Sequence, residues 1–91
     1  MFKTLEELIV IIRKRKESST EESYTNKLLN NKKLSIEKVK EEIAELIEAI
    51  EKNTNKVHEA ADVLYHLMTL LEANDIKIED VMNELKKRQK K

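Results

Sequence analysis

The chain has 91 residues, 40% of them charged, and contains no glycine, proline or cysteine. These absences exclude a P-loop, a glycine-rich dinucleotide turn, a disulfide and a thiolate metal site or nucleophile. Eighteen basic residues balance eighteen acidic ones, which argues against nucleic acid as a partner. Because the longest uncharged apolar stretch, Leu8 to Ile12, has only five residues, we expect no membrane segment or signal peptide and a soluble, cytoplasmic protein.

Helical periodicity without strand-like alternation predicts an all-α fold: a single domain over residues 1–91, with four to five helices in a bundle. The first helix is expected from about Leu5 to Lys16, after a capping box formed by Thr4 and Glu7. A polar linker follows, over residues 17–23. A short second helix, residues 24–30, should end at Asn30-Asn31, because asparagine tolerates the left-handed conformation that glycine usually supplies.

Three longer helices are expected in the rest of the chain. The first begins after Ser35 as N-cap and runs to about Lys52, the second covers residues 56–73, and the third covers residues 78–89. Turns at residues 53–55 and 74–75 separate them. The first of these helices carries an apolar stripe made of Ile36, Val39, Ile43, Leu46, Ile47 and Ile50.

The helix over residues 56–73 is the most apolar, yet it carries a narrow polar stripe. At about 100° per residue, Glu59, Asp62 and His66 fall within roughly 60° of one another. Buried acids are costly unless they are paired or bind a metal. The stripe therefore indicates either a site or the solvated face of an amphipathic helix, and these alternatives are about equally supported.

The preceding helix supplies further acids. Glu41, Glu45 and Glu48 lie nearly opposite its apolar stripe, as on a plain solvated face, whereas Glu42 lies at the edge of the stripe. The tight turn predicts antiparallel packing of the two helices, so residues 45 and 59 can face each other. Four or five converging carboxylates would repel, and a hard cation such as Mg²⁺, which prefers oxygen ligands, would relieve that repulsion. The absence of cysteine and the positions of the histidines argue against zinc.

The pattern Glu41-Glu42-x-x-Glu45 followed by Glu59-x-x-Asp62 is similar to the signature of the all-α nucleoside-triphosphate pyrophosphohydrolases, the MazG-like enzymes. Within that superfamily the chain resembles the phosphoribosyl-ATP pyrophosphatase family. Three segments carry the closer resemblance, and a fourth also fits: residues 23–29 (SYTNKLL), 38–46 (KVKEEIAEL), 59–67 (EAADVLYHL) and 78–85 (IEDVMNEL). Lys40 stands where the family has glycine, Glu37 where lysine is common, and the segment between residues 29 and 36 is about one residue short.

This resemblance implies Mg²⁺-dependent hydrolysis of phosphoribosyl-ATP to phosphoribosyl-AMP and pyrophosphate, the second step of histidine biosynthesis. It implies catalytic roles for Glu41, Glu42 and Glu45, and metal ligation by Glu42, Glu45, Glu59 and Asp62. The carboxylate that takes the proton of the attacking water is not singled out. The implied substrate contacts are Ser23, Tyr24, Thr25 and Lys27, with Lys27 as phosphate partner.

Simpler explanations remain for several of these residues. Helix packing would account for Tyr24, and a solvated side chain for Lys27. His66 is expected to be a buried orienting residue rather than a ligand, and His58 to be exposed. The basic run from Arg13 to Lys16 could reach the triphosphate or be a solvated helix end.

Two other functions stay open: a house-cleaning pyrophosphohydrolase acting on another nucleotide, and a non-enzymatic helical interaction module. The Ser-Tyr-Thr element at residues 23–25 favours the phosphoribosyl-ATP substrate over the former. The acids on the apolar helix disfavour the latter. Because a short chain with such an apolar helix would leave hydrophobic surface exposed, we expect a homodimer that completes the bundle, as the resemblance also implies.

Overall fold

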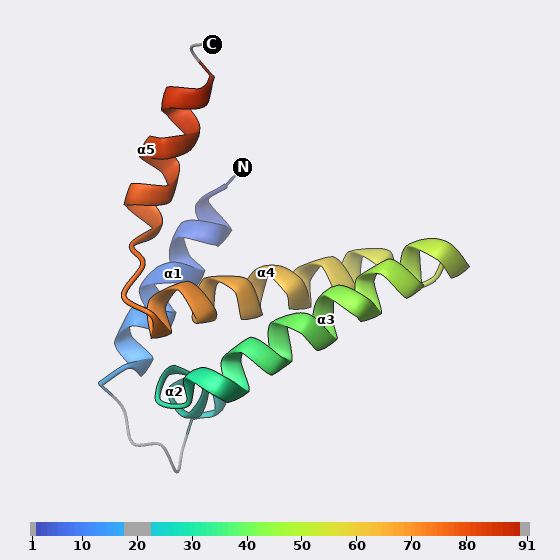
Figure 1. The fold of residues 1–91 in the computed structure, drawn as a ribbon, viewed down its shortest axis with the longest axis horizontal. Helices are drawn as coiled ribbons and strands as arrows, with labels where there is room; N and C mark the ends of the chain where they lie inside the picture. Colours follow the sequence, from blue (N-terminus) through green and yellow to red (C-terminus); the bar gives the residue numbers. More distant parts are fainter. Residues whose placement is uncertain (1, 18–22, 90–91) are drawn as a thin grey trace.

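The computed structural model describes residues 2–17 and 23–89, which form five α-helices. They are α1 (Lys3–Arg15), α2 (Tyr24–Leu29), α3 (Lys32–Lys52), α4 (Lys56–Ala73) and α5 (Ile78–Arg88). Figure 1 shows an L-shaped chain: α3 and α4 form one arm as a long hairpin, α1 and α5 form the other, and α2 lies near the corner. The predicted all-α class is confirmed. Most of the predicted linker, residues 18–22, lies outside the described residues.

The predicted capping box at the start of α1 is wrong. Thr4 lies inside the helix, because the Glu6 backbone N–H already donates to the Phe2 carbonyl oxygen over 3.2 Å. Phe2 is therefore the N-cap residue, and its side chain makes no capping hydrogen bond.

The predicted start of α3 after Ser35 is also wrong. Asn31 is the N-cap, and its side chain accepts a hydrogen bond of 3.0 Å from the Leu34 N–H. Ser35 lies one turn into the helix, where it is buried and donates its hydroxyl to the Leu28 carbonyl oxygen. The hydroxyl thus joins α3 to α2 instead of capping a helix.

Among the described residues, three take up left-handed backbone conformations: Asn53, Asn55 and Asp75, with φ of 56°, 44° and 57°. Asn53 ends α3 in a Schellman-type turn, in which the Thr54 N–H donates to the Ala49 carbonyl oxygen over 2.9 Å. At Asn30, where a left-handed cap was predicted, φ is −97°, so that prediction is wrong. In a chain without glycine, asparagine and aspartate are the residues that enter this region at least cost.

The buried core is small and lies at the corner, where α1, α2 and α4 meet. Its central residues are Ile12, Leu29 and Ala73, with Leu8 and Met68 packed against them. Beside this core, the buried Asn26 donates its side-chain amide to the Arg15 carbonyl oxygen and accepts from the Asn30 side chain. The bond to Arg15 holds α2, which carries the predicted substrate residues, against the end of α1.

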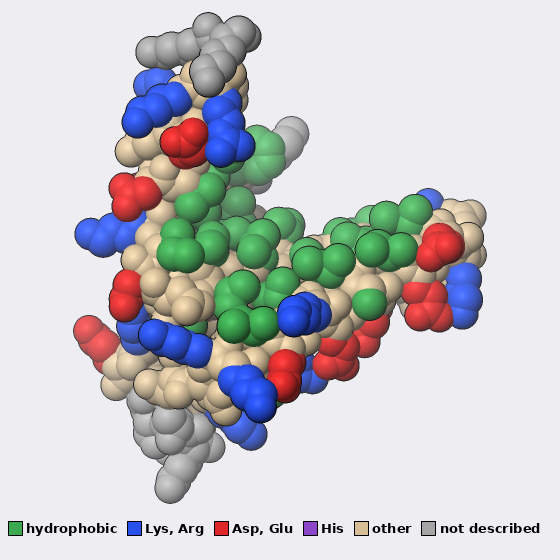
Figure 2. Space-filling model, viewed as in Figure 1, with side chains coloured by type: hydrophobic (Ala, Val, Ile, Leu, Met, Phe, Trp, Pro, Cys, Tyr) green, Lys and Arg blue, Asp and Glu red, His purple; other side chains and the backbone are tan. Residues whose placement is uncertain are grey.

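The isoleucine stripe of α3 does not face the core of the chain. Ile36, Ile43, Ile47 and Ile50 are between 42% and 57% exposed. The side of α3 that packs against the rest of the chain instead carries Val39, Glu42 and Ala49, which are buried. Figure 2 shows hydrophobic side chains gathered along the inner side of the L, over both arms. Glu42, placed by the sequence at the edge of the stripe, is thus well inside the packed side.

Ion pairs attach α5 to the rest of the chain. The Arg13 guanidinium donates two hydrogen bonds to Glu79, of 3.0 and 2.6 Å, and one of 3.4 Å to Glu72. The Lys16 ammonium lies 3.1 Å from an Asp75 carboxylate oxygen. Two of the four cations in the basic run from residue 13 to residue 16 are therefore engaged in holding helices together. No helix within the described ranges is long and apolar enough to cross a membrane.

The Arg13–Glu79 pair predicts how stability depends on acid pH. Arg13 lowers the pKa of Glu79 from 4.5 to about 2, so the pair stabilises the folded chain above pH 4.5 and loses this effect as pH falls toward 2. Glu79→Gln should therefore lower stability at pH 7 and weaken its fall below pH 4.5, as measured by urea unfolding. The matched control is Glu84→Gln, since Glu84 pairs with Arg88 of the same helix and not with α1 in the described residues. Equal pH profiles for the two variants would contradict the prediction.

Candidate active site

Three carboxylates converge between α3 and α4. Glu42, Glu45 and Glu59 each offer one oxygen, and these oxygens lie within 4.8 Å of one another. The Glu42 side chain is only 12% exposed. Its Oε2 atom and that of Glu59 are buried and find no hydrogen-bond partner in the described part of the chain. The structure thus brings the acids of residues 45 and 59 together across the hairpin, as the antiparallel packing predicted.

The electrostatics of this group reflect burial and mutual repulsion. Burial raises the pKa of Glu42 to about 7, and the neighbouring Glu45 carboxylate contributes to the rise. Burial likewise raises the pKa of Glu59, again with the charge of Glu45 adding to the effect. Because burial disfavours the charged forms and the carboxylates repel one another, the group favours a proton or a metal ion.

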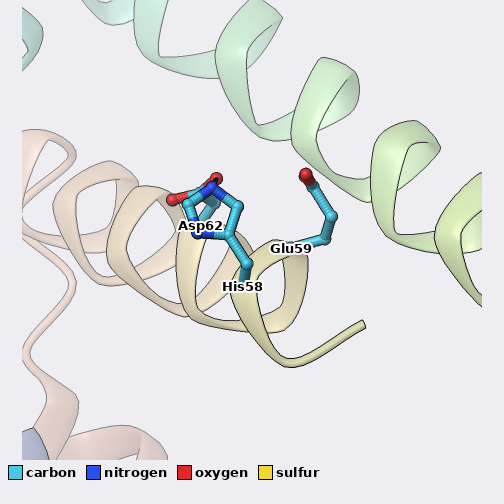
Figure 3. A group of neighbouring side chains, drawn as sticks. All are labelled: His58, Glu59 and Asp62. Atoms are coloured by element: carbon cyan, nitrogen blue, oxygen red, sulfur yellow. Dashed lines mark ion pairs between the residues drawn. The ribbon is translucent and has the colours of Figure 1, made fainter. Parts of the chain in front are cut away.

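A second group lies along α4 and shares Glu59 with the first. His58, Glu59 and Asp62 offer ligand atoms within 4.8 Å of one another, and His58 Nε2 lies 3.4 Å from Asp62 Oδ2. Figure 3 shows the His58 and Asp62 side chains side by side, while Glu59 extends toward the neighbouring helix. Asp62 is therefore linked to the three-carboxylate group through Glu59. His58 is exposed, as predicted, with 72% of its side chain accessible.

Glu41 lies outside both groups. Its carboxylate is 3.3 Å from the Lys38 ammonium on the same helix, and this hydrogen bond raises the pKa of Lys38. Half of the Glu41 side chain is exposed. Of the five acids in the sequence pattern, four are thus linked in space, and Glu41 lies beside them on the solvent side.

The substrate residues implied by the resemblance lie at the start of α2, and several make contacts within the chain. Ser23 caps α2, its Oγ accepting from the Asn26 N–H over 3.1 Å. The Thr25 hydroxyl is hydrogen-bonded to the Tyr65 hydroxyl. Tyr24 remains half exposed although its ring meets the edge of His66, with centroids 6.1 Å apart. Lys27 is exposed.

Sequence reasoning gave no role in the site to His58, Lys38 or Tyr65. The position of His58 one turn before Asp62 was a signal that could have found it. Lys38 likewise lies one turn before Glu42. Burial has the larger effect on the pKa of Tyr24 and of His66, and the charge of Lys38 acts to lower both values. The hydrogen bond that joins Tyr65 to Thr25 spans forty residues of sequence and leaves no local signal.

An all-α hairpin with acids of both helices facing each other defines a class of protein with a carboxylate site suited to a hard cation. A model of the family described as phosphoribosyl-ATP pyrophosphohydrolase matches residues 5–89. The chain belongs to this family, which confirms the resemblance seen in the sequence and the prediction of a hydrolase.

Curated relatives agree with this assignment. The phosphoribosyl-ATP pyrophosphatase of Clostridium novyi is 46% identical over 91 residues, which cover 96% of this chain and 82% of that protein. The phosphoribosyl-ATP pyrophosphatase of Methanococcoides burtonii is 39% identical over 92% of this chain and 90% of its own length. The histidine biosynthesis bifunctional protein HisIE of Pyrococcus furiosus is 47% identical over 94% of this chain, which spans only 41% of that longer protein.

Proposed function

We propose that the acids of α3 and α4 hydrolyse phosphoribosyl-ATP to phosphoribosyl-AMP and pyrophosphate with the help of Mg²⁺. The observation that carries this proposal is the convergence of Glu42, Glu45 and Glu59, two of them with a buried, unpartnered oxygen, in a chain of this family. These products require water to attack the α- or the β-phosphorus and the anhydride bond between these two phosphates to break. The attacked phosphorus takes the hydroxyl, and the other fragment leaves with the bridging oxygen.

The donor set fits a hard divalent cation. All ligands are carboxylate oxygens, which suit Mg²⁺ and Mn²⁺ better than softer metals. In the proposal Glu42, Glu45, Glu59 and Asp62 hold the ion. When bound, Mg²⁺ would neutralise phosphate charge and polarise the phosphoryl oxygens. With these four acids as ligands, Glu41 is the acid of the set that is left to accept the proton of the attacking water.

The start of α2 and the nearby turn of α3 would bind the substrate. Tyr24 is half exposed beside the acids, and the exposed Lys27 offers a charge for a phosphate. Lys38, whose charge reaches Tyr24, is a second cation on this side. Its pairing with the acid Glu41 is at the surface, where such pairs are weak and a triphosphate can compete for the ammonium.

One assay separates this proposal from its alternatives. Release of pyrophosphate is measured with phosphoribosyl-ATP and with a panel of nucleoside triphosphates, each with and without Mg²⁺. We expect turnover of phosphoribosyl-ATP only, and only with the metal. Faster hydrolysis of another triphosphate would indicate a house-cleaning pyrophosphohydrolase, and no hydrolysis of any of them would indicate a helical interaction module. The cytoplasmic location expected from the sequence stays a prediction.

We also propose that two copies of the chain form a dimer. In the described residues, thirteen large hydrophobic side chains are exposed, whereas only six hydrophobic residues are buried. Exposed positions on the hairpin form an apolar face made of Ile36, Ile43, Ile47, Ile50, Val57 and Leu64. A second copy, which carries the same face, would cover it around a two-fold axis, as in most soluble oligomers.

The dimer predicts a clear effect of Ile47→Glu. Ile47 is 53% exposed in the single chain, so a charge there costs little unless a partner covers it. Light scattering at micromolar concentration should give twice the 10.7 kDa chain mass for the unchanged protein and for the control Ile47→Val. Ile47→Glu should give the mass of one chain. A mass near 10.7 kDa for the unchanged, fully active protein would contradict the proposal.

A further inference from the structure

The imidazole of His66 is a buried polar group to which the proposed reaction gives no task. It lies on α4, is 8% exposed, and places Nε2 3.6 Å from Oε1 of Glu42. Its Nδ1 is buried, and no hydrogen-bond partner for it occurs in the described part of the molecule. Buried polar atoms are normally paired, so a buried histidine in this position calls for an explanation.

Aromatic rings on two helices fix the orientation of this imidazole. The Tyr65 ring meets it edge-on with centroids 4.9 Å apart, and the Tyr24 ring does so at 6.1 Å. Tyr65 is in turn hydrogen-bonded to Thr25 of α2. The ring nitrogen that faces Glu42 is Nε2.

We propose that His66 is a positioning residue for Glu42. Its Nε2–H faces Oε1 and holds the carboxylate so that Oε2, which has no other partner, is directed to the group shared with Glu45 and Glu59. The two atoms lie 3.6 Å apart, beyond hydrogen-bond distance, and we expect a hydrogen bond to form between them when a cation binds. This inference rests on the metal-dependent function proposed above.

The role has a physical precedent in metal sites generally. Carboxylate ligands are themselves held by hydrogen bonds, and loss of such a partner typically lowers metal affinity or activity by about 10- to 100-fold. Glu42 depends on such support because its Oε2 finds no hydrogen-bond partner in the described part of the chain. An N–H donor at Oε1 orients the carboxylate and leaves Oε2 free to bind a cation.

Two substitutions separate positioning from simple packing. His66→Gln keeps an amide N–H near the place of Nε2, whereas His66→Leu fills the space and removes the donor. Mn²⁺ binding is followed by electron paramagnetic resonance, and folding by thermal unfolding in chelator. We expect His66→Leu to bind Mn²⁺ about 10- to 100-fold more weakly and to lower kcat more than it raises KM. His66→Gln should bind Mn²⁺ nearly as the unchanged protein does.

Two results of this comparison would overturn the inference: Mn²⁺ binding by His66→Leu as tight as that of the unchanged protein, or binding by His66→Gln as weak as that of His66→Leu. If the unchanged protein does not bind Mn²⁺ at all, the proposed metal-dependent function itself fails. That result is distinct from a failure of the inference about His66.

A measurement on the unchanged protein remains decisive even if His66→Leu does not fold. The chain has two histidines, so ¹⁵N spectra of the imidazoles show two spin systems, which His58→Asn assigns. We expect His66 to carry its proton on Nε2 and that proton to shift and exchange more slowly when Mg²⁺ is added. A proton on Nδ1, or no response to a saturating cation, would contradict a positioning role.

Discussion

Glu45→Gln is expected to lower turnover by about two to three orders of magnitude, because several kcal/mol of charge stabilisation in the transition state are lost. The same substitution should keep or raise the thermal stability of the metal-free protein. Glu45 is one of three converging carboxylates, and its charge helps to raise the pKa of Glu42 and of Glu59. Removing that charge relieves repulsion in the folded state. Asp62→Asn should behave in the same way.

The measurements are kcat with saturating phosphoribosyl-ATP and the unfolding temperature in chelator. The control is Glu51→Gln, an exposed glutamate on the same helix that belongs to neither carboxylate group. This control should leave both quantities near their original values. Near-normal turnover in both Glu45→Gln and Asp62→Asn would mean that the acids are a solvated face and that the reaction occurs elsewhere.

Exhaustive chelation is expected to abolish activity, and added Mg²⁺ or Mn²⁺ to restore it. The ligand atoms available are carboxylate oxygens that repel one another, so a hard cation relieves the repulsion and supplies the charge that the triphosphate requires. Because the ion binds only the folded chain, saturating Mg²⁺ should also raise the unfolding temperature.

The rise in unfolding temperature with Mg²⁺ should be much smaller for Glu45→Gln than for the control Glu51→Gln, since only the former loses a ligand. This comparison separates specific binding from a general effect of divalent ions on a charged surface. Full activity after complete removal of divalent ions would rule out the metal-assisted mechanism.

The sequence predicted the helices well and their first residues poorly, for one physical reason. The hydrophobic period of a helix extends over many residues, so α4 was predicted with the bounds that the structure has. The position of an N-cap, in contrast, depends on a few backbone N–H groups at the start of the helix and on which side chain is free to accept from them. Ser35 and Asn31 are both good capping residues, and only the docking of α2 decides that the Ser35 hydroxyl turns to Leu28.

The candidate site, too, could be predicted from the sequence only in part. The facing of Glu45 and Glu59 followed from the short turn and antiparallel packing. The burial of Glu42 could not be predicted. An apolar stripe indicates that another surface covers the stripe, but it does not show which surface that is. The isoleucines of α3 remain exposed in the single chain, and α4 packs on the adjoining side instead.

The turn between α3 and α4 consists of residues 53–55, and its two asparagines occupy left-handed conformations. Because α4 begins directly after this turn, inserting or deleting one residue here would change which side of α4 faces α3. Glu59 and Asp62 would then leave the site although every acid was still present in the sequence. The length of this turn is therefore as strict a requirement for a working enzyme as the carboxylates, and natural variation should change its side chains while keeping its three positions.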